Sequence, residues 1–278
     1  MSLIIGIDVG GSTTKIVGIE NGTDIKSPMN ITANDPITSL FGAFGKYIYD
    51  NGIQLDDIEH VMLTGVGSSG VTTPIYGLPT TRVDEFIADG LGARYDSGLK
   101  QLIVVSMGTG TTLVRVDGND ISHIGGISMG GGTLQGLSHL LLNTSHISDV
   151  VEMASRGDIS RINLQIKDIS KTDIEGLPMH ATASLFAKVV SSNASQEDIA
   201  KGLICMVLET IGSCAVLSQG NGGFKDFVLI GNLTLLPECQ VIFPMMESLY
   251  DVKFYIPEHA RFCTALGAAL AYNNREIL

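Results

Sequence analysis

The chain has 278 residues, and its 44% hydrophobic and 17% charged content is typical of a globular protein with a large buried core. The formal net charge is -12, from 17 basic and 29 acidic residues, which argues against a duplex nucleic acid or an anionic membrane surface as partner. No apolar run reaches the ~18 residues that a membrane span needs, and the sequence enters its first predicted strand without a basic leader. We therefore expect a cytoplasmic protein.

Residues 3–20 predict two strands joined by a polar turn. Asp8 interrupts the apolar run before the turn, and because a buried carboxylate is costly without a partner, it requires a cation or hydrogen-bond donors nearby. The turn offers backbone, hydroxyl and ammonium groups from Gly10, Gly11, Ser12, Thr13, Thr14 and Lys15. This pattern favours a phosphate-binding turn with Asp8 facing a metal ion. A glycine pair that only turns a hairpin is the alternative.

Residues 102–118 repeat this pattern, with a strand, a turn rich in glycine and threonine, a second strand, and an acidic residue followed by glycine. Thr111 and Thr112 take the place of Thr13 and Thr14. A unit that occurs twice in one chain indicates internal duplication. The repetition favours the phosphate-binding interpretation of both turns.

Helices and strands are predicted to alternate after each hairpin. Residues 36–52 predict an amphipathic helix with an Asp-Pro start and a Gly end, and residues 61–65 predict the next strand. Residues 146–192 predict mainly helix, apart from a polar stretch. A long helix is expected to begin at Ser195, and a later strand ends at Gly231, where a flat ring could lie across the backbone.

Glu85 is the first candidate catalytic residue. A short strand runs into a helix at about Asp84, which places Glu85 at the start of that helix and near the carboxyl edge of the sheet. Open α/β sheets bind ligands at this edge. Glu85 could equally be a first-turn residue that the helix dipole stabilises.

Residues 125–133 are unusually rich in glycine and lead directly into a leucine-rich helix. Gly130, Gly131 and Gly132 would then present free backbone N–H groups at a helix N-terminus, which is a natural anion site. A flexible linker is the alternative.

The cysteines and histidines show no metal-binding spacing. Four cysteines lie singly in apolar surroundings, which favours buried free thiols over a disulfide framework or a zinc site: Cys205, Cys214, Cys239 and Cys263. The six histidines form no H-x-x-x-H pair, so a catalytic metal held by imidazole is not supported.

Together these motifs resemble the actin, Hsp70 and sugar-kinase superfamily of ATP-dependent phosphotransferases, and most closely the type II pantothenate kinases. The segments that carry the resemblance are residues 6–15, 84–86, 108–112, 125–137, 156–158 and 230–231. It implies two duplicated ribonuclease-H-like (actin-like ATPase) domains of the α/β class, with mixed sheets flanked by helices and a cleft between them. The expected domains are residues 1–98 and residues 99–278, the second with a helical dimerisation region.

The resemblance also implies roles for individual residues. The catalytic residues would be Asp8, which would hold Mg²⁺, and Glu85, the general base that takes the proton from the substrate's primary hydroxyl. ATP and its phosphates would contact Gly10, Gly11, Ser12, Thr13, Lys15, Gly108, Thr109, Gly110, Thr111, Gly130, Gly131, Gly132 and Gly231. The substrate would contact Glu85, Thr109, His123 and Gly130.

The activity implied is ATP-dependent phosphorylation of pantothenate to 4'-phosphopantothenate, the first step of coenzyme A biosynthesis, by a cytoplasmic homodimer that uses ATP and Mg²⁺. Two departures concern the acceptor. His123 stands where relatives carry an arginine that reaches the substrate carboxylate, and an imidazole makes no bidentate guanidinium clamp. Ile147 stands where relatives place a tyrosine in the substrate pocket.

Three other activities are alternatives. One is an ATPase that activates a 2-hydroxyacyl-CoA dehydratase, whose iron-sulfur cluster would need exposed thiolates. Another is a kinase of the same fold that acts on an amino sugar. The third is an actin-like or chaperone-like nucleotide switch without a small-molecule acceptor.

Overall fold

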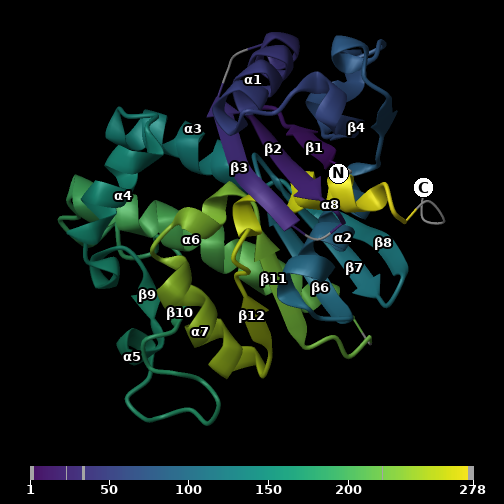
Figure 1. The fold of residues 1–278 in the computed structure, drawn as a ribbon. Coiled ribbons are helices and arrows are strands. Elements are labelled where there is room, and N and C mark those ends of the chain that lie inside the picture. The colour runs from purple at the N-terminus through teal and green to yellow at the C-terminus, as the bar shows by residue number, and fades with distance from the viewer. Residues whose placement is uncertain (1–2, 23, 33–34, 221, 275–278) are drawn as a thin grey trace.

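The computed structural model describes residues 3–22, 24–32, 35–220 and 222–274, and contains two five-stranded mixed sheets with helices on their faces (Figure 1). In the first sheet the order is β3-β2-β1-β4-β5. Its strands are β1 (Leu3–Val9), β2 (Thr13–Glu20), β3 (Asp24–Thr32), β4 (Ile58–Thr64) and β5 (Thr80–Arg82). The first three strands are antiparallel, and β4 and β5 continue the sheet in parallel with β1.

The second sheet repeats the first. Its order is β12-β11-β6-β7-β8, so that an antiparallel meander is again followed by two parallel strands. The strands are β6 (Gln101–Met107), β7 (Thr111–Asp117), β8 (Asp120–Ile127), β11 (Asp226–Ile230) and β12 (Lys253–Tyr255). The predicted fold class, with its duplicated mixed sheets, is confirmed. The domain boundary at residues 98 and 99 stays a prediction.

Helices cover both faces of each sheet. Helix α1 (Pro36–Asn51) packs on one face of the first sheet, while α2 (Glu85–Ser97) and α8 (Cys263–Ala271) pack on the other. Helix α2 also contacts the second sheet, so it lies between the two sheets. The remaining face of the second sheet is covered by α3 (Gly131–Leu142), α4 (Ile147–Ser155), α6 (Gln196–Ser218) and α7 (Cys239–Tyr250).

Helices α2 and α8 approach so closely that glycine is required at the crossing. A Cβ atom on Gly267 would lie 1.8 Å from the carbonyl oxygen of Ala88, and one on Gly92 would lie 1.9 Å from that of Cys263. The small residues of α8 thus allow it to approach α2 closely. Helix α8 is thereby packed tightly against α2, the helix that lies between the two sheets.

Residues 146–192 are less helical than predicted. Helix α4 is followed by short elements: β9 (Leu164–Gln165), α5 (Ile166–Ile169) and β10 (Thr182–Ser184). Buried Asn163 accepts a hydrogen bond from the backbone of Phe186 at 3.1 Å. This bond ties the segment before β9 to the segment after β10.

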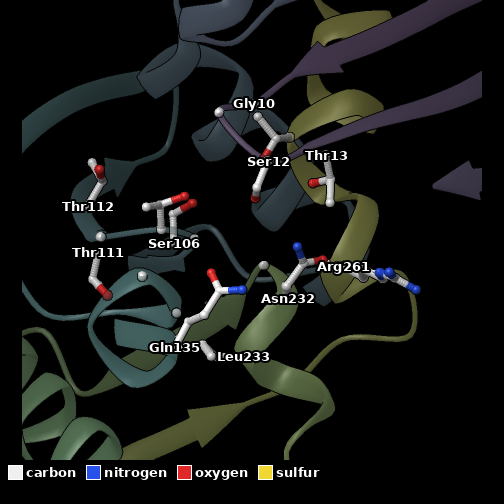
Figure 2. A pocket seen from close by; sticks show the side chains of 18 of the residues that line it. Gly10, Ser12, Thr13, Ser106, Thr111, Thr112, Gln135, Asn232, Leu233 and Arg261 are labelled. Atoms are coloured by element: carbon white, nitrogen blue, oxygen red, sulfur yellow. Dashed lines mark hydrogen bonds between the residues drawn. The ribbon is translucent and has the colours of Figure 1, made fainter. Parts of the chain in front are cut away.

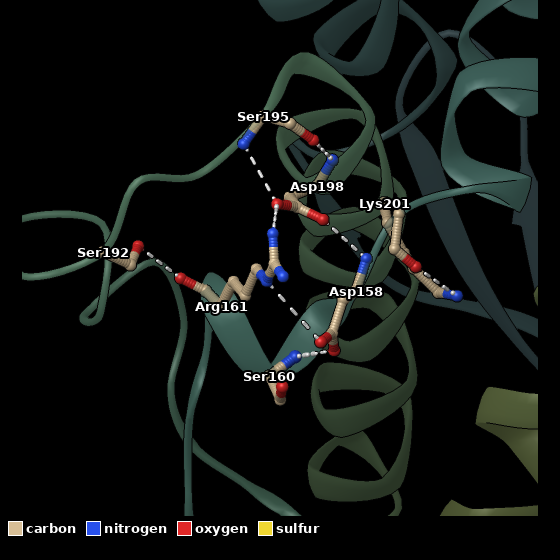
Figure 3. A network of polar contacts seen from close by, with 8 residues as sticks. Asp158, Ser160, Arg161, Ser192, Ser195, Asp198 and Lys201 are labelled. Carbon is tan, nitrogen blue, oxygen red and sulfur yellow. Dashed lines mark hydrogen bonds and ion pairs between the residues drawn. The ribbon is translucent and has the colours of Figure 1, made fainter.

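The start of α6 is held by a polar network (Figure 3). Ser195 caps the helix by accepting from Asp198 N, and buried Asp198 accepts from the backbone N–H groups of Ser195 and Asp158 at 3.0 and 2.7 Å. Arg161 lies 3.7 Å from the same carboxylate. These contacts fasten the turn after α4 to the long helix.

Helix α6 is the core helix of the second half. By length and composition it could cross a membrane, yet 61% of its apolar window is buried inside the fold. Its buried side chains form one cluster with the second sheet and with α7. Its hydrophobicity is therefore used for packing within the protein.

The four cysteines are free. Cys205, Cys239 and Cys263 are buried and Cys214 is half-buried, which confirms the predicted free thiols. Burial raises the pKa of Cys205 and of Cys239 to about 12, so both remain thiols at neutral pH.

Candidate active site

A cavity of about 1150 Å³ opens where the carboxyl ends of the central strands of both sheets meet. The predicted site residues that line it are Asp8, Gly10, Gly11, Ser12, Thr13, Lys15, Glu85, Gly108, Thr109, Gly110, Thr111, Gly131, Gly132 and Gly231. Gly130 and His123 are not among the lining residues. Figure 2 shows Ser12 and Thr13 of the first hairpin on one side of this space, and Ser106, Thr111 and Thr112 of the second on another.

The first turn is closed by a hydrogen bond from Gly10 N to Thr13 O at 2.9 Å. Gly65, which follows β4, packs directly against this turn, since a Cβ there would lie 2.4 Å from the carbonyl oxygen of Val9. Its φ of 88° also favours glycine. The hydroxyls of Ser12 and Thr13 are thereby held at the wall of the cavity.

Asp8 and Lys15 form a buried ion pair across the first hairpin. Their side chains face each other in register on β1 and β2, with 3.3 Å between Lys15 Nζ and Asp8 Oδ2. Both residues are less than a tenth exposed. Lys15 is therefore the cation that the buried position of Asp8 requires.

The glycine-rich run packs onto the second turn. A Cβ on Gly130 would lie 2.6 Å from Thr109 O, and Gly131 N and Gly132 N donate to Gly108 O and Thr109 O, both at 2.9 Å. The expectation that these glycines present free N–H groups is therefore wrong for Gly131 and Gly132. Their amides fix the second turn, because the backbones can touch only where side chains are absent.

Glu85 is the first residue of α2, and Asp84 caps the helix by accepting hydrogen bonds from Phe86 N and Ile87 N. Burial raises the pKa of Glu85, and the nearby carboxylate of Asp8 raises it further, while Lys15 acts in the opposite direction. A carboxylate with a raised pKa is a stronger base toward an alcohol. Its place in the cavity combines this property with access to a ligand.

Comparison with known proteins identifies the family. The profile of the Fumble family matches residues 96–271. The chain belongs to the Fumble family. Two curated relatives are type II pantothenate kinases: that of Staphylococcus epidermidis is 30% identical over 276 residues, covering 95% of this chain and 98% of the relative. The type II pantothenate kinase of Staphylococcus aureus is 27% identical over 277 residues, covering 95% of this chain and 97% of the relative.

Solved structures share the fold of this Fumble-family chain. The activator of 2-hydroxyisocaproyl-CoA dehydratase from Clostridium difficile, with bound ADPNP, has a TM-score of 0.69 at 18% identity and covers 99% of this chain and 98% of its own. Component A of (R)-2-hydroxyglutaryl-CoA dehydratase from Acidaminococcus fermentans has a TM-score of 0.70 at 17% identity, covering 99% of this chain and 100% of its own. A ROK hexokinase from Thermus thermophilus reaches 0.58 at 13%, covering 99% of each chain. At these identities the likeness concerns the fold.

His123 of the Fumble-family chain is exposed on β8 and stacks on Phe86, with ring centroids 4.0 Å apart and planes 7° apart. Phe86 is the neighbour of Glu85 in α2. His123 therefore touches the helix that carries Glu85 instead of lining the cavity. Ile147, at the start of α4, does line it.

Sequence reasoning missed several polar residues of this site. Asp89 is buried behind Glu85, and the cavity wall also includes Ser106, Gln135, Asn232 and Arg261. Asn232 directly follows the predicted Gly231, which could have drawn attention to it. No sequence motif pointed to Arg261. It lies at the cavity because the segment between β12 and α8 crosses from the second sheet to the first.

Proposed function

We propose that the chain is an ATP-dependent kinase that phosphorylates the primary hydroxyl of pantothenate to 4'-phosphopantothenate, the first step of coenzyme A biosynthesis. The observation that carries this proposal is the position of Glu85 in one cavity with both hydroxyl-bearing turns. The names of the curated relatives support it. Phosphoryl transfer requires mainly positioning and charge neutralisation, which such a cavity can supply.

Each part of the cavity would have one task. The turns at residues 10–15 and 108–111 would bind the phosphates of ATP, and Gly231 would lie under the base. Glu85 would accept the proton of the pantothenate hydroxyl as its oxygen attacks the γ-phosphorus. The bond from that phosphorus to the bridging oxygen then breaks, and ADP leaves.

The donor set in this cavity fits Mg²⁺. This ion prefers oxygen ligands and is commonly held by one or two carboxylates together with substrate phosphates. The cavity wall includes the carboxylates of Asp8 and Glu85. Asp8 would hold the ion, which would neutralise phosphate charge.

The acceptor would lie beside Glu85 and Thr109. Gly130 does not line the cavity, and it would affect the acceptor only through its close packing on Thr109. The predicted contact of His123 with the substrate would require the substrate to extend past Phe86. Pantothenate carries a carboxylate at the end remote from its primary hydroxyl, and that carboxylate would be the group that reaches His123.

We infer a cytoplasmic homodimer of two-domain chains, with the boundary near residues 98 and 99. The helices of the second half would form the contact, because exposed leucines occur on α3 and α6. Leu140, Leu141 and Leu217 are 76%, 50% and 77% exposed. Sedimentation equilibrium tests the assembly, and a monomer at micromolar concentration would contradict it.

A coupled ADP-release assay tests the reaction. Pantothenate, pantetheine and N-acetylhexosamines are offered separately with ATP and Mg²⁺, and product formation is followed by mass spectrometry. We expect ADP and phosphopantothenate in equal amounts. Release with a sugar and none with pantothenate would make the chain a sugar kinase, and slow release that no alcohol stimulates would make it a nucleotide switch.

A further inference from the structure

Arg261 occupies the place where the chain crosses from one sheet to the other. It lies in the 3₁₀ helix η6 (Ala260–Phe262), which follows β12 of the second sheet and leads into α8 on the first. This short helix also contacts β2. Arg261 lines the cavity, and Figure 2 shows it beside Asn232.

Two hydrogen bonds hold Arg261 against the end of β11. The backbone N–H of Gly231 donates to Ala260 O at 2.9 Å, and Arg261 Nε donates to Asn232 Oδ1 at 3.1 Å. The guanidinium carbon also lies 5.8 Å from the ring centroid of Phe262. Because its orientation is already fixed, the side chain would lose little conformational entropy when a ligand binds.

The charge of Arg261 is available to a ligand. Within the described part of the chain, the cavity wall includes two cationic side chains, Lys15 and Arg261. Lys15 is paired with Asp8 at 3.3 Å, whereas Arg261 forms no ion pair with any described carboxylate. Its terminal nitrogens, and the side of the guanidinium that is not next to the Phe262 ring, are therefore available to a ligand.

The surroundings of Arg261 suit an aromatic ring. The phosphate-type turns belong to the two hairpins, while the wall that follows Gly231 and Asn232 is apolar. Leu233, Leu235 and Leu236 all contribute to it. A guanidinium plane beside an apolar wall is an arrangement that binds flat, π-rich rings, since arginine stacks on aromatic faces.

We propose that Arg261, oriented by Asn232, binds the base of the nucleotide, with its guanidinium plane against the aromatic ring. The inference rests on the proposed function in one respect, namely that this cavity takes ATP. It assigns a nucleotide-binding role to a residue outside the glycine-rich turns. It also gives Asn232 the role of a positioning residue.

Direct binding measurements test this role without any acceptor. ATP, ADP, adenosine and inorganic tripolyphosphate are titrated by displacement of a fluorescent ADP analogue from wild type, Arg261→Gln, Arg261→Lys and Asn232→Ala. Arg115→Gln is the matched control, because Arg115 is a half-exposed arginine of β7 that pairs with Asp120 at 3.6 Å. Thermal melting of each variant verifies that it is folded.

For Arg261→Gln we expect the Kd of ATP, ADP and adenosine to rise together by about tenfold, the usual size of a lost stacking contact. Tripolyphosphate should bind as before. Arg261→Lys should lose most of the same affinity, because lysine keeps the charge but not the plane. Asn232→Ala should raise the Kd of ATP, ADP and adenosine by about threefold, as expected for the loss of one hydrogen bond.

Unchanged adenosine affinity in Arg261→Gln would overturn the proposal, and so would weaker binding of tripolyphosphate, which would assign the side chain to phosphate. Failure of the kinase reaction is a separate result. If wild type binds ATP but does not phosphorylate pantothenate, the proposed function falls, while the titrations still decide the role of Arg261.

Discussion

Asp89 lies one turn beyond Glu85 on α2 and accepts a hydrogen bond from Thr264 Oγ1 at 2.6 Å. It is 1% exposed, and its Oδ2 atom has no hydrogen-bond partner among the described residues. Burial raises the pKa of Asp89 to about 7, and the charges of Glu85 and Asp8 act in the same direction. A carboxyl group that keeps its proton here limits the negative charge behind Glu85.

Replacing Asp89 by Asn should change how stability depends on pH. Between the ordinary pKa of 3.8 and about 7, the folded state keeps a proton that the unfolded state has released. Because the proton is released from the unfolded state first, the stability of wild type falls as the pH rises through this range. Asn accepts the same hydrogen bond and does not ionise, so the stability of Asp89→Asn relative to wild type should increase from pH 4 to pH 7.

Urea denaturation at several pH values measures this difference, with m-values compared to verify that the same transition is observed. A difference between the two proteins that stays constant across the range would contradict a raised pKa at Asp89.

Replacing Gly267 by Ala should destabilise the protein by at least about 2 kcal/mol, because the new methyl group would overlap the backbone of Ala88 and force α2 and α8 apart. Gly42→Ala is the matched control. Gly42 lies exposed within α1, a Cβ there meets nothing within 4 Å, and alanine should stabilise the helix by up to about 1 kcal/mol. Chemical denaturation gives the free energy of unfolding of both variants. Equal changes in the two variants would show that the crossing of α2 and α8 tolerates a side chain.

The polar network at the start of α6 should make the second half sensitive to acid. Asp198 is desolvated, which raises its pKa, but the N–H groups of Asp158 and Ser195 outweigh this and hold the pKa below the ordinary 3.8. A lowered pKa contributes stability above the unfolded value, and that contribution is lost as the pH falls through the folded value. Asp198→Asn should therefore be less stable than wild type at pH 7.

The difference between wild type and Asp198→Asn should shrink as the pH falls below 3.8. Ser195→Ala, which removes only the cap, should cost about 1 kcal/mol at either pH. Thermal melts at pH 7 and near pH 3 distinguish the two variants. If Asp198→Asn and Ser195→Ala lost the same stability at both pH values, the charge of Asp198 would contribute nothing to stability.

The sequence predicted those parts of the fold that depend on local pattern. The strand and turn chemistry around Asp8 recurs around Thr111, and this repetition within the chain indicates the two duplicated sheets. The requirement that Asp8 have a cation nearby was also local, and Lys15 meets it from the paired strand.

Relationships between distant segments could not be predicted in the same way. Asp89 meets Thr264, and Asn232 meets Arg261, only because α8 returns from the second sheet to the first. The amides of Gly131 and Gly132 were expected to be free, since their partners belong to a turn more than twenty residues earlier. Periodicity gives no information about such pairs.

The most direct test of the central proposal is the steady-state phosphorylation of pantothenate by Glu85→Gln, with Glu152→Gln as control because Glu152 is an exposed residue of α4 paired with Arg156. Loss of the general base should lower kcat by at least about 10², while the Kd of ATP stays the same. Burial raises the pKa of Glu85, so the wild-type rate should increase as the pH rises through that pKa. A Glu85→Gln enzyme that turns over pantothenate as fast as wild type would contradict the account.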